Sequence, residues 1–200
     1  MSQDPRHIHL DPLGGISGDM FLAALLDAWP EAGDGLETAM RSAGLPDDWT
    51  FSVEATADGV LTGTRVAIRP PEAGKSRPTG AFRELRERLA RAALTDAVKE
   101  GAIAILTQLA TAEAAVHGVA IDAVHFHELA DWDSIADVVG AAYLIDRLAP
   151  ESWSTGPLPF GAGRVQTAHG PLPVPAPATA KLLAGFEVVA DGIGGERVTP

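Results

Sequence analysis

Residues 96–118 read DAVKEGAIAILTQLATAEAAVHG and have the period of a long amphipathic helix. Apolar residues recur at intervals of three and four and form one stripe: Val98, Ala102, Ile105, Leu106 and Leu109. Gly118 follows the last periodic residues, where glycine commonly ends a helix. We therefore predict a helix over residues 96–117 with one face in a hydrophobic core.

Other helices are predicted on both sides of this one. Residues 82–92 have a helical period, and a later helix begins at Asp131 or Asp133. That later helix should bury five apolar side chains: Ile135, Val138, Val139, Ala142 and Ile145. The helix after Asp19 should be buried on more than one side through Met20, Phe21, Leu22, Leu25 and Leu26. Shorter helices are expected up to about residue 43 and at 177–184.

Extended segments alternate with these helices. Strands are predicted at residues 7–10, 121–127, 153–160 and 186–190. A β-hairpin or meander is predicted at 50–69, where Asp58-Gly59 supplies the turn. Prolines 171, 173, 175 and 177 make the segment before the last helix stiff and extended. The predicted class is α+β, a mixed sheet packed with several helices in an α/β sandwich-like arrangement.

Residues 1–200 are expected to form one domain, with a flexible, proline-rich loop near residues 70–78. That loop could instead mark a seam between two subdomains. Hydrophobic residues make up 46% of the chain and charged residues 21%, which is enough for a substantial core.

The chain is acidic and has no cysteine. It has 15 basic against 27 acidic residues, so nucleic acid is not expected as a partner, because phosphate binding needs a basic face. Without thiolates, a metal would have to be bound by nitrogen and oxygen. The first residues have no signal pattern and no apolar run is long enough to span a membrane. We therefore expect a cytoplasmic protein without a membrane partner.

Two imidazoles and four carboxylates lie within residues 124–137: His125, His127, Glu128, Asp131, Asp133 and Asp137. In an extended segment His125 and His127 point to the same side, while Phe126 packs into the core. Imidazole and carboxylate groups bind nickel, zinc, iron or manganese, so the cluster predicts a metal site. The alternatives are hydrogen-bonded histidines on a polar sheet face, and a solvated helix face with Asp133 as its cap.

Glu113 and His117 lie four residues apart on the predicted long helix, with Glu113 on its apolar stripe. A buried carboxylate needs a partner, and His117 is one turn away. The pair could orient a ligand or act as a general base. It could also be a helix-end hydrogen bond with no chemical role.

His7, His9 and Asp11 alternate at the end of a predicted strand, which places them on one face. Metal-dependent hydrolases of the amidohydrolase type begin in this way, and this gives a second candidate function. That family needs a (β/α)₈ barrel of about 250 residues. The rest of the chain lacks the regular alternation of strands and helices that such a barrel needs.

Two glycine-rich turns are candidate anion sites. Residues 14–19 precede a helix whose first amides could bind phosphate, with Ser17 and Asp19 as lining groups or only as caps. The second turn contains the other candidates: Gly161, Gly163, Arg164, Thr167 and His169. Arg164 could bind phosphate through its planar fork, although glycine pairs are also common in plain turns.

Three strings occur in order and span nearly the whole chain: DPLGGISGDMFLAALLDA at 11–28, AEAAVHGVAIDAVHFHELADWDSIADVVGA at 112–141 and HGPLPVPAPATAKLL at 169–183. Together they resemble the amino-terminal part of the LarC family, the nickel insertion proteins of nickel-pincer nucleotide cofactor synthesis. The resemblance favours nickel over the other metals.

The resemblance implies a CTP-dependent cyclometallase, a lyase-class nickel insertase that places nickel into pyridinium-3,5-bisthiocarboxylic acid mononucleotide. Two sulfurs and a ring carbon of the substrate then hold the nickel, which agrees with a protein lacking cysteine. The ring carbon must lose a proton, for which His117 or His169 could be the base. A non-catalytic nickel-binding or storage domain is the alternative.

The site residues implied are a nickel set of His125, His127 and a carboxylate from Glu128, Asp133 or Asp137. Asp11, Asp19 and His169 should line the same cleft. The glycine-rich turns, with Ser17, Gly161, Gly163 and Arg164, should hold the phosphate of the mononucleotide substrate.

The chain departs from the family at two places. Ala130-Asp131-Trp132 stands where members usually have Gly-Ala-Val, which adds a carboxylate and an indole beside the predicted metal site. The sequence ends at Pro200 inside a Thr-Pro-Thr-Gly motif. We therefore expect a fragment or a split protein, with CTP and a divalent cation bound by a carboxy-terminal domain in cis or in trans. A homo-oligomer is a further alternative.

Overall fold

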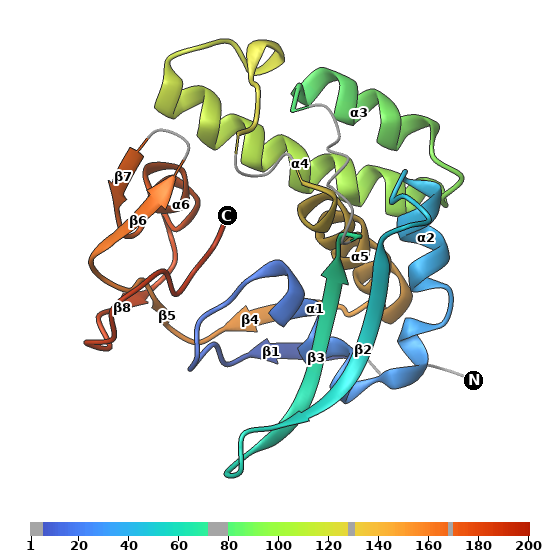
Figure 1. Ribbon diagram of the computed structural model, residues 1–200, viewed down its shortest axis with the longest axis horizontal. Helices are drawn as coiled ribbons and strands as arrows, with labels where there is room; N and C mark the ends of the chain where they lie inside the picture. The colour runs from blue at the N-terminus through green and yellow to red at the C-terminus, as the bar shows by residue number, and fades with distance from the viewer. Residues whose placement is uncertain (1–5, 72–79, 128–130, 168–169) are drawn as a thin grey trace.

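The computed structural model describes residues 6–71, 80–127, 131–167 and 170–200 (Figure 1). Its α-helices are α1 (Gly18–Ala28), α2 (Leu36–Ser42), α3 (Phe82–Arg91), α4 (Asp96–His117), α5 (Trp132–Leu148) and α6 (Pro177–Leu182). Two short 3-10 helices are η1 (Pro30–Gly33) and η2 (Ile121–Ala123). The strands are β1 (His7–Leu10), β2 (Thr50–Ala57), β3 (Thr62–Arg69), β4 (Ser152–Thr155), β5 (Leu158–Pro159), β6 (Arg164–Thr167), β7 (Gly170–Pro173) and β8 (Val188–Val189).

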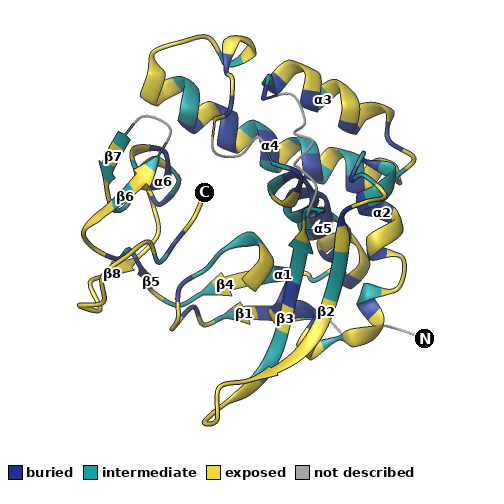
Figure 2. Ribbon diagram, viewed as in Figure 1, coloured by how far each residue is buried: buried dark blue, intermediate teal, exposed yellow. Residues whose placement is uncertain are grey.

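Helix α4 lies at the centre of the helical core and packs against α3, α5 and α6. It spans the predicted residues, begins at the N-cap Thr95 and ends at Gly118, whose φ of 67° is left-handed. Its contact with α5 is close, because a Cβ on Gly101 would lie only 3.3 Å from the Ala142 Cβ. The buried side of α4 is dark blue in Figure 2, facing α5.

Helix α5 also contacts α1 and α2, so it is covered on several sides. A Cβ on Gly140 would lie 2.8 Å from Met40 and 3.0 Å from Leu22, which means that only glycine allows this approach without movement of those side chains. Four of the five side chains expected to be buried on α5 are buried, but Ile145 is 37% exposed. Leu144 and Leu148 take the buried positions in the last turns, because the apolar stripe drifts around the helix.

The α+β class is confirmed, but the described strands form four separate two-stranded sheets instead of one mixed sheet. Two pairs are parallel (β1 with β4, β5 with β8) and two are antiparallel (β2 with β3, β6 with β7). The predicted hairpin at 50–69 is the β2–β3 pair, which projects from the molecule (Figure 1). In β7, Pro171 and Pro173 lack the N–H groups that a further strand would need.

Two other expectations need correction. Residues 121–127 are not one strand: η2 occupies 121–123, and only a single bridge joins His125 to Ala81. Met20 is 45% exposed, because the buried face of α1 is formed by Leu22, Leu25 and Leu26. Most of the loop expected near residues 70–78 lies outside the described residues. No helix in the described ranges is long and apolar enough to cross a membrane.

A smaller apolar cluster forms around Leu158, Leu183 and Val198. It is tied to the start of α1 by the C-terminal segment, defined here as residues 195–199. Ile16 pairs with Val198 in parallel, and the Ile16 N–H donates to the Arg197 carbonyl at 2.8 Å. Gly15 has φ +108°, and a Cβ there would collide with the same Arg197 carbonyl oxygen.

We predict that Gly15→Ala destabilises the chain more than Gly59→Ala. Both glycines have positive φ, but no atom of the described part of the chain lies within 4 Å of a Cβ on Gly59. Gly59→Ala should cost about 1 kcal/mol for the left-handed backbone alone. Gly15→Ala should cost at least roughly 1 kcal/mol more, because it also displaces the C-terminal segment. Urea unfolding measures both, and equal losses would contradict the predicted contact.

Candidate metal and substrate site

Three imidazoles lie next to one another beside the end of α4. The ring centroids of His125 and His127 are 5.8 Å apart, and those of His117 and His127 are 6.4 Å apart. His117, in the last turn of α4, also has its Nε2 3.3 Å from Oε2 of Glu113. This group of His117, His125 and His127 is called the imidazole cluster below.

The alternation of the segment after η2 turns two of these rings outward. Val124 and Phe126 are 4% and 2% exposed, whereas His125 and His127 are exposed. This confirms the expectation that Phe126 packs into the core with the histidines on the other side. The segment is held by two backbone hydrogen bonds, Phe126 N–H to Gly80 at 2.8 Å and Phe82 N–H to Val124 at 3.1 Å.

Gly80 is a positioning residue that sequence patterns did not reveal. A Cβ on it would lie 2.6 Å from Nδ1 of His125 and 2.5 Å from the Phe126 carbonyl oxygen. The backbone at this point is therefore in direct contact with the imidazole, and no side chain fits between them.

A pocket of about 400 Å³ opens beside the imidazole cluster, between α4 and the segment from β6 to α6. Its imidazole groups belong to His117 and His127, and its carboxylate groups belong to Glu113 and Glu196. The other lining residues are Val116, Val165, Gln166, Thr167, Leu172, Ala176, Pro177, Ala178 and Pro200. The pocket therefore places metal-binding nitrogens against a largely apolar wall.

The imidazole cluster is not a complete metal site by itself. Within the described ranges, no three histidine, aspartate or glutamate side chains are arranged to hold a metal ion. Glu128 and His169, both predicted site residues, lie outside the described residues. The predicted ligand set therefore stays a prediction.

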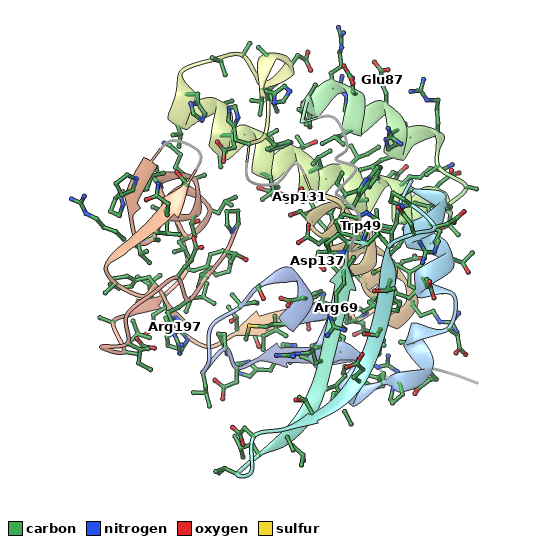
Figure 3. The ribbon with its side chains drawn as sticks, in the orientation of Figure 1. Trp49, Arg69, Glu87, Asp131, Asp137 and Arg197 are labelled. Carbon is green, nitrogen blue, oxygen red and sulfur yellow. The ribbon has the colours of Figure 1, made fainter. Side chains whose placement is uncertain are left out.

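Asp133 and Asp137 line a different cleft together with Asp19, and of these three residues Figure 3 labels Asp137. This cleft has a volume of about 420 Å³ and also contains Arg65 and Arg69 of β3. The two arginines were not singled out from the sequence, although their spacing of four places them on one face of the strand. The acidic cleft is defined below as these five residues.

Burial, with the charges of Asp19 and Asp133, raises the pKa of Asp137 to about 8. Oδ1 of Asp137 is buried, and no hydrogen-bond partner for it is present among the described residues. The start of α1 causes this crowding, because a Cβ on Gly18 would lie 2.5 Å from Oδ2 of Asp137. At neutral pH this carboxyl is therefore mostly protonated and can donate or release a proton.

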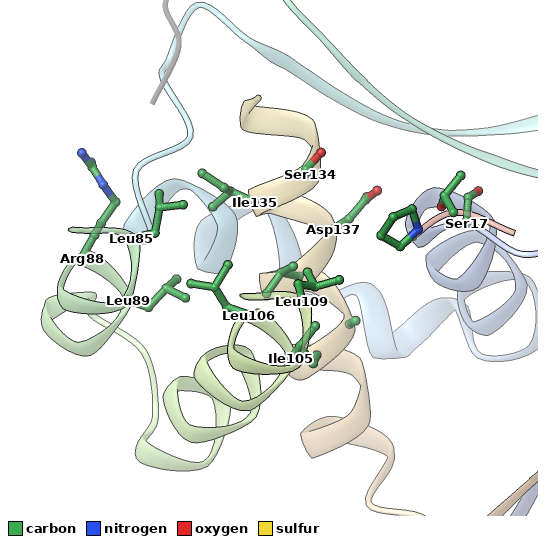
Figure 4. Close-up of a pocket in the computed structure, with 15 residues that line it drawn as sticks. Ser17, Leu85, Arg88, Leu89, Ile105, Leu106, Leu109, Ser134, Ile135 and Asp137 are labelled. Atoms are coloured by element: carbon green, nitrogen blue, oxygen red, sulfur yellow. The ribbon is translucent and has the colours of Figure 1, made fainter. Parts of the chain in front are cut away.

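Asp137 also borders an apolar pocket of about 360 Å³ on its other side (Figure 4). Most of its wall is formed by apolar side chains of α3, α4 and α5: Leu85, Leu89, Ile105, Leu106, Leu109, Ile135 and Val138. Ser17 and Gly18 of the first glycine-rich turn complete it near Asp137. Asp137 thus lines both an apolar pocket and the acidic cleft.

Both glycine-rich turns pair with the C-terminal segment. Ile16 pairs with Val198, and Ala162 pairs with Gly195. The amides of Ile16 and Ala162 are thereby used within the chain. Asp19 already places a carboxylate at the start of α1, where Ser17 donates a hydrogen bond to it.

The remaining predicted substrate groups are more dispersed. Gly161 and Gly163 have positive φ values of 74° and 100° in the second turn, and Arg164 begins β6 with an exposed side chain. Asp11 follows β1, and its Oδ1 lies 3.6 Å from the position of a Cβ on Gly156. Phosphate binding by the second glycine-rich turn and a place for Asp11 in the substrate cleft stay predictions.

The sequence model of the family described as "Nickel insertion protein" matches residues 8–200. Similar proteins from Geobacter sulfurreducens and Thermomicrobium roseum are both 44% identical, over 96% and 98% of this chain. A protein from Myxococcus xanthus is 38% identical over 98% of the chain. All three have the name "Putative nickel insertion protein". The alignments cover 49%, 48% and 49% of these proteins, so the chain spans about half the length of the curated relatives it matches. No solved structure matches the chain.

We predict that Gly80→Ala displaces His125 and costs roughly 1–3 kcal/mol of unfolding free energy, because the added carbon overlaps backbone and imidazole atoms. Gly63→Ala is the matched control, since none of the described residues comes within 4 Å of a Cβ there. Urea unfolding gives the cost, and the His125 ring resonance in NMR spectra reports the displacement. An unshifted resonance in Gly80→Ala would refute the contact.

We also predict that Asp137 makes stability fall with pH. Its folded pKa of about 8 is above the ordinary 3.8, so the folded state holds a proton that the unfolded state has lost between these values. The contribution is complete below about pH 4 and is lost as the pH rises to 8. Relative to Asp137→Asn, the parent should lose up to about 1.4 kcal/mol per pH unit in this window.

Thermal or urea unfolding across pH 4 to 8 measures this difference. Asp146→Asn is the matched control, because Asp146 is an exposed carboxylate on the same helix. It should follow the pH profile of the parent. If Asp137→Asn also follows the parent, then Asp137 does not hold the extra proton.

Proposed function

The chain belongs to the nickel insertion protein family, and on that premise we propose that it is the nickel-binding part of a CTP-dependent cyclometallase. The substrate is pyridinium-3,5-bisthiocarboxylic acid mononucleotide, and the product is the nickel-pincer nucleotide cofactor. Nickel is cargo in this reaction and leaves with the product. The protein must therefore bind the ion and also release it.

The observation that supports this proposal most directly is the imidazole cluster beside the 400 Å³ pocket. Imidazole is a good ligand for nickel. A protein that surrounds its metal completely would hold it as a resident ion. An incomplete set of nitrogens leaves positions where the two sulfurs of the substrate can bind, which suits transfer.

In the proposed site, His125 and His127 bind nickel together with a carboxylate. Glu128 is the carboxylate adjacent in sequence. Asp133 and Asp137 were the other candidates, but both line the acidic cleft and not the pocket that contains His127. We therefore favour Glu128 as the third ligand.

Formation of the nickel–carbon bond requires that the ring carbon lose its proton. His117 is the proposed acceptor, because it lines the same pocket as His127 and has Glu113 beside it. With Nε2–H directed to Glu113, the proton is accepted at Nδ1, and the carboxylate stabilises the resulting imidazolium. His169 is the alternative base predicted from the sequence.

CTP and its divalent cation are proposed to bind the carboxy-terminal part found in the longer relatives, acting in cis or in trans. The phosphate of the mononucleotide is proposed to bind near the second glycine-rich turn, where Arg164 is exposed. Val165, Gln166 and Thr167, which follow in β6, line the pocket beside the imidazole cluster. The cationic Arg164 therefore directly precedes, in the sequence, residues that line the proposed substrate pocket.

We predict that His125→Ala/His127→Ala lowers nickel affinity at least about tenfold, or roughly 1.4 kcal/mol, because two nitrogen ligands are lost. Isothermal titration with nickel measures it. Asp122→Asn is the control, since Asp122 is an exposed carboxylate in the preceding η2 and pairs with Arg86 at 3.4 Å. Unchanged affinity and stoichiometry in the double variant would exclude the site.

Turnover separates an insertase from a nickel storage domain. The chain, with the carboxy-terminal part supplied in trans, should form the nickel product from the thiocarboxylated mononucleotide and CTP, followed by absorbance. His117→Ala should reduce the turnover number at least roughly tenfold while nickel affinity stays unchanged, because it removes a base and no ligand. Nickel binding without any product would favour storage, and hydrolysis of simple amides or esters would favour a metal-dependent hydrolase.

A further inference from the structure

The exposed face of the β1–β4 pair contains a second group of histidines. The two strands are parallel, with His7 opposite Ser152 and His9 opposite Ser154. Ile8, between the histidines, is 4% exposed and packs into the core, whereas both histidines and both serines are exposed. The strands therefore present a ladder of imidazole and hydroxyl groups to solvent.

Both imidazoles are directed at one hydroxyl. Nε2 of His7 lies 2.8 Å from the Ser154 Oγ, and Nδ1 of His9 lies 2.7 Å from the same atom. Nδ1 of His7 lies 2.8 Å from the Ser152 Oγ. A serine hydroxyl has one proton, so it donates to one ring at most, and the other ring must donate to it. Two ring nitrogens thus converge on a single point.

Paired strands hold this convergence in place. The parallel pairing of β1 with β4 fixes the positions of His7 and His9. The pairing extends past the strand end, where the Gly156 N–H donates to the Leu10 carbonyl at 2.9 Å. Asp11 lies close to Gly156, because a Cβ on that glycine would be 3.6 Å from Oδ1 of Asp11. Asp11 continues the alternation of His7 and His9 along the chain. Among the described residues, however, no three histidine, aspartate or glutamate side chains are arranged around one ion.

We propose that His7 and His9 form a second, solvent-exposed binding site for a borderline divalent metal ion such as nickel. Metal–imidazole bonds are about 2.0–2.1 Å long, so each nitrogen would move roughly 0.7 Å closer to the ion than it lies to the hydroxyl. Ser154 rotates away, and water completes the coordination. The proposal does not depend on the proposed function, because the two rings bind an ion whatever the rest of the chain does.

This site is distinct from the imidazole cluster. In Figure 1 the yellow segment around η2 lies at the top of the view, beyond α4, whereas β1 and β4 lie in the lower half. One ion cannot bridge the two groups. The chain should therefore bind two ions, of which the one at His7 and His9 exchanges readily with solvent, since only two protein ligands hold it.

The test is a nickel chloride titration of four proteins by calorimetry: the parent, His125→Ala/His127→Ala, His7→Ala/His9→Ala, and the protein with all four substitutions. If His7 and His9 bind an ion, the His125→Ala/His127→Ala protein still binds it and the quadruple variant does not. His117→Ala in the His125→Ala/His127→Ala background is the matched control and should retain that ion. If adding His7→Ala/His9→Ala to this background changes neither stoichiometry nor affinity, the proposal is overturned.

Ser154→Ala distinguishes a metal site from a hydrogen-bonded brace between the strands. It removes the shared hydroxyl and leaves both nitrogens, so nickel should bind the His125→Ala/His127→Ala background as tightly as before or more tightly. Loss of binding on Ser154→Ala would overturn the two-nitrogen site. His7→Gln/His9→Gln keeps polar side chains on the strand if the alanine variant fails to fold, and must also lose the ion.

A measurement on the parent protein needs no variant. Substoichiometric nickel is paramagnetic and should broaden the ring proton resonances of His7 and His9. Sharp resonances for these two rings, with broadening confined to the imidazole cluster, would overturn the second site and leave the proposed function intact. Broadening confined to His7 and His9 would support the second site and count against the proposed nickel position.

Discussion

The close packing of α4 against α5 is the contact on which both candidate regions depend. Gly101 and Ala142 bring the two helices together without an intervening side chain. His117 lies in the last turn of α4, and Asp133 and Asp137 lie in the first turns of α5. Because α4 positions one ring of the imidazole cluster and α5 positions two carboxylates of the acidic cleft, a change in their packing would move these groups relative to one another.

Much of the secondary structure follows from local patterns. The apolar stripe of α4 and the alternation around Asp58-Gly59 are strong because each spans many residues. Strand pairing was less predictable. β1 pairs with β4 and β5 pairs with β8, and strands of two to four residues contain too little pattern to specify a distant partner. The four separate sheets were therefore not foreseen.

The candidate site shows the same division between local and distant effects. The outward direction of His125 and His127 follows from the apolar Val124 and Phe126 beside them. The contact between His125 and Gly80 depends on a segment far away in sequence. Asp133 and Asp137 are four residues apart and so lie on one face of the helix, but the strongest influence on the pKa of Asp137 is its burial under the start of α1.

The protonated Asp137 changes how the charge of this acidic protein should be counted. The formal net charge of −12 assigns a full negative charge to every carboxylate. With a pKa of about 8, Asp137 keeps its proton in the folded chain at pH 7, so the folded protein is close to one unit less negative. At neutral pH Asp137 therefore takes up a proton from solution when the chain folds. In a weakly buffered sample, this uptake would by itself make the solvent more alkaline on refolding.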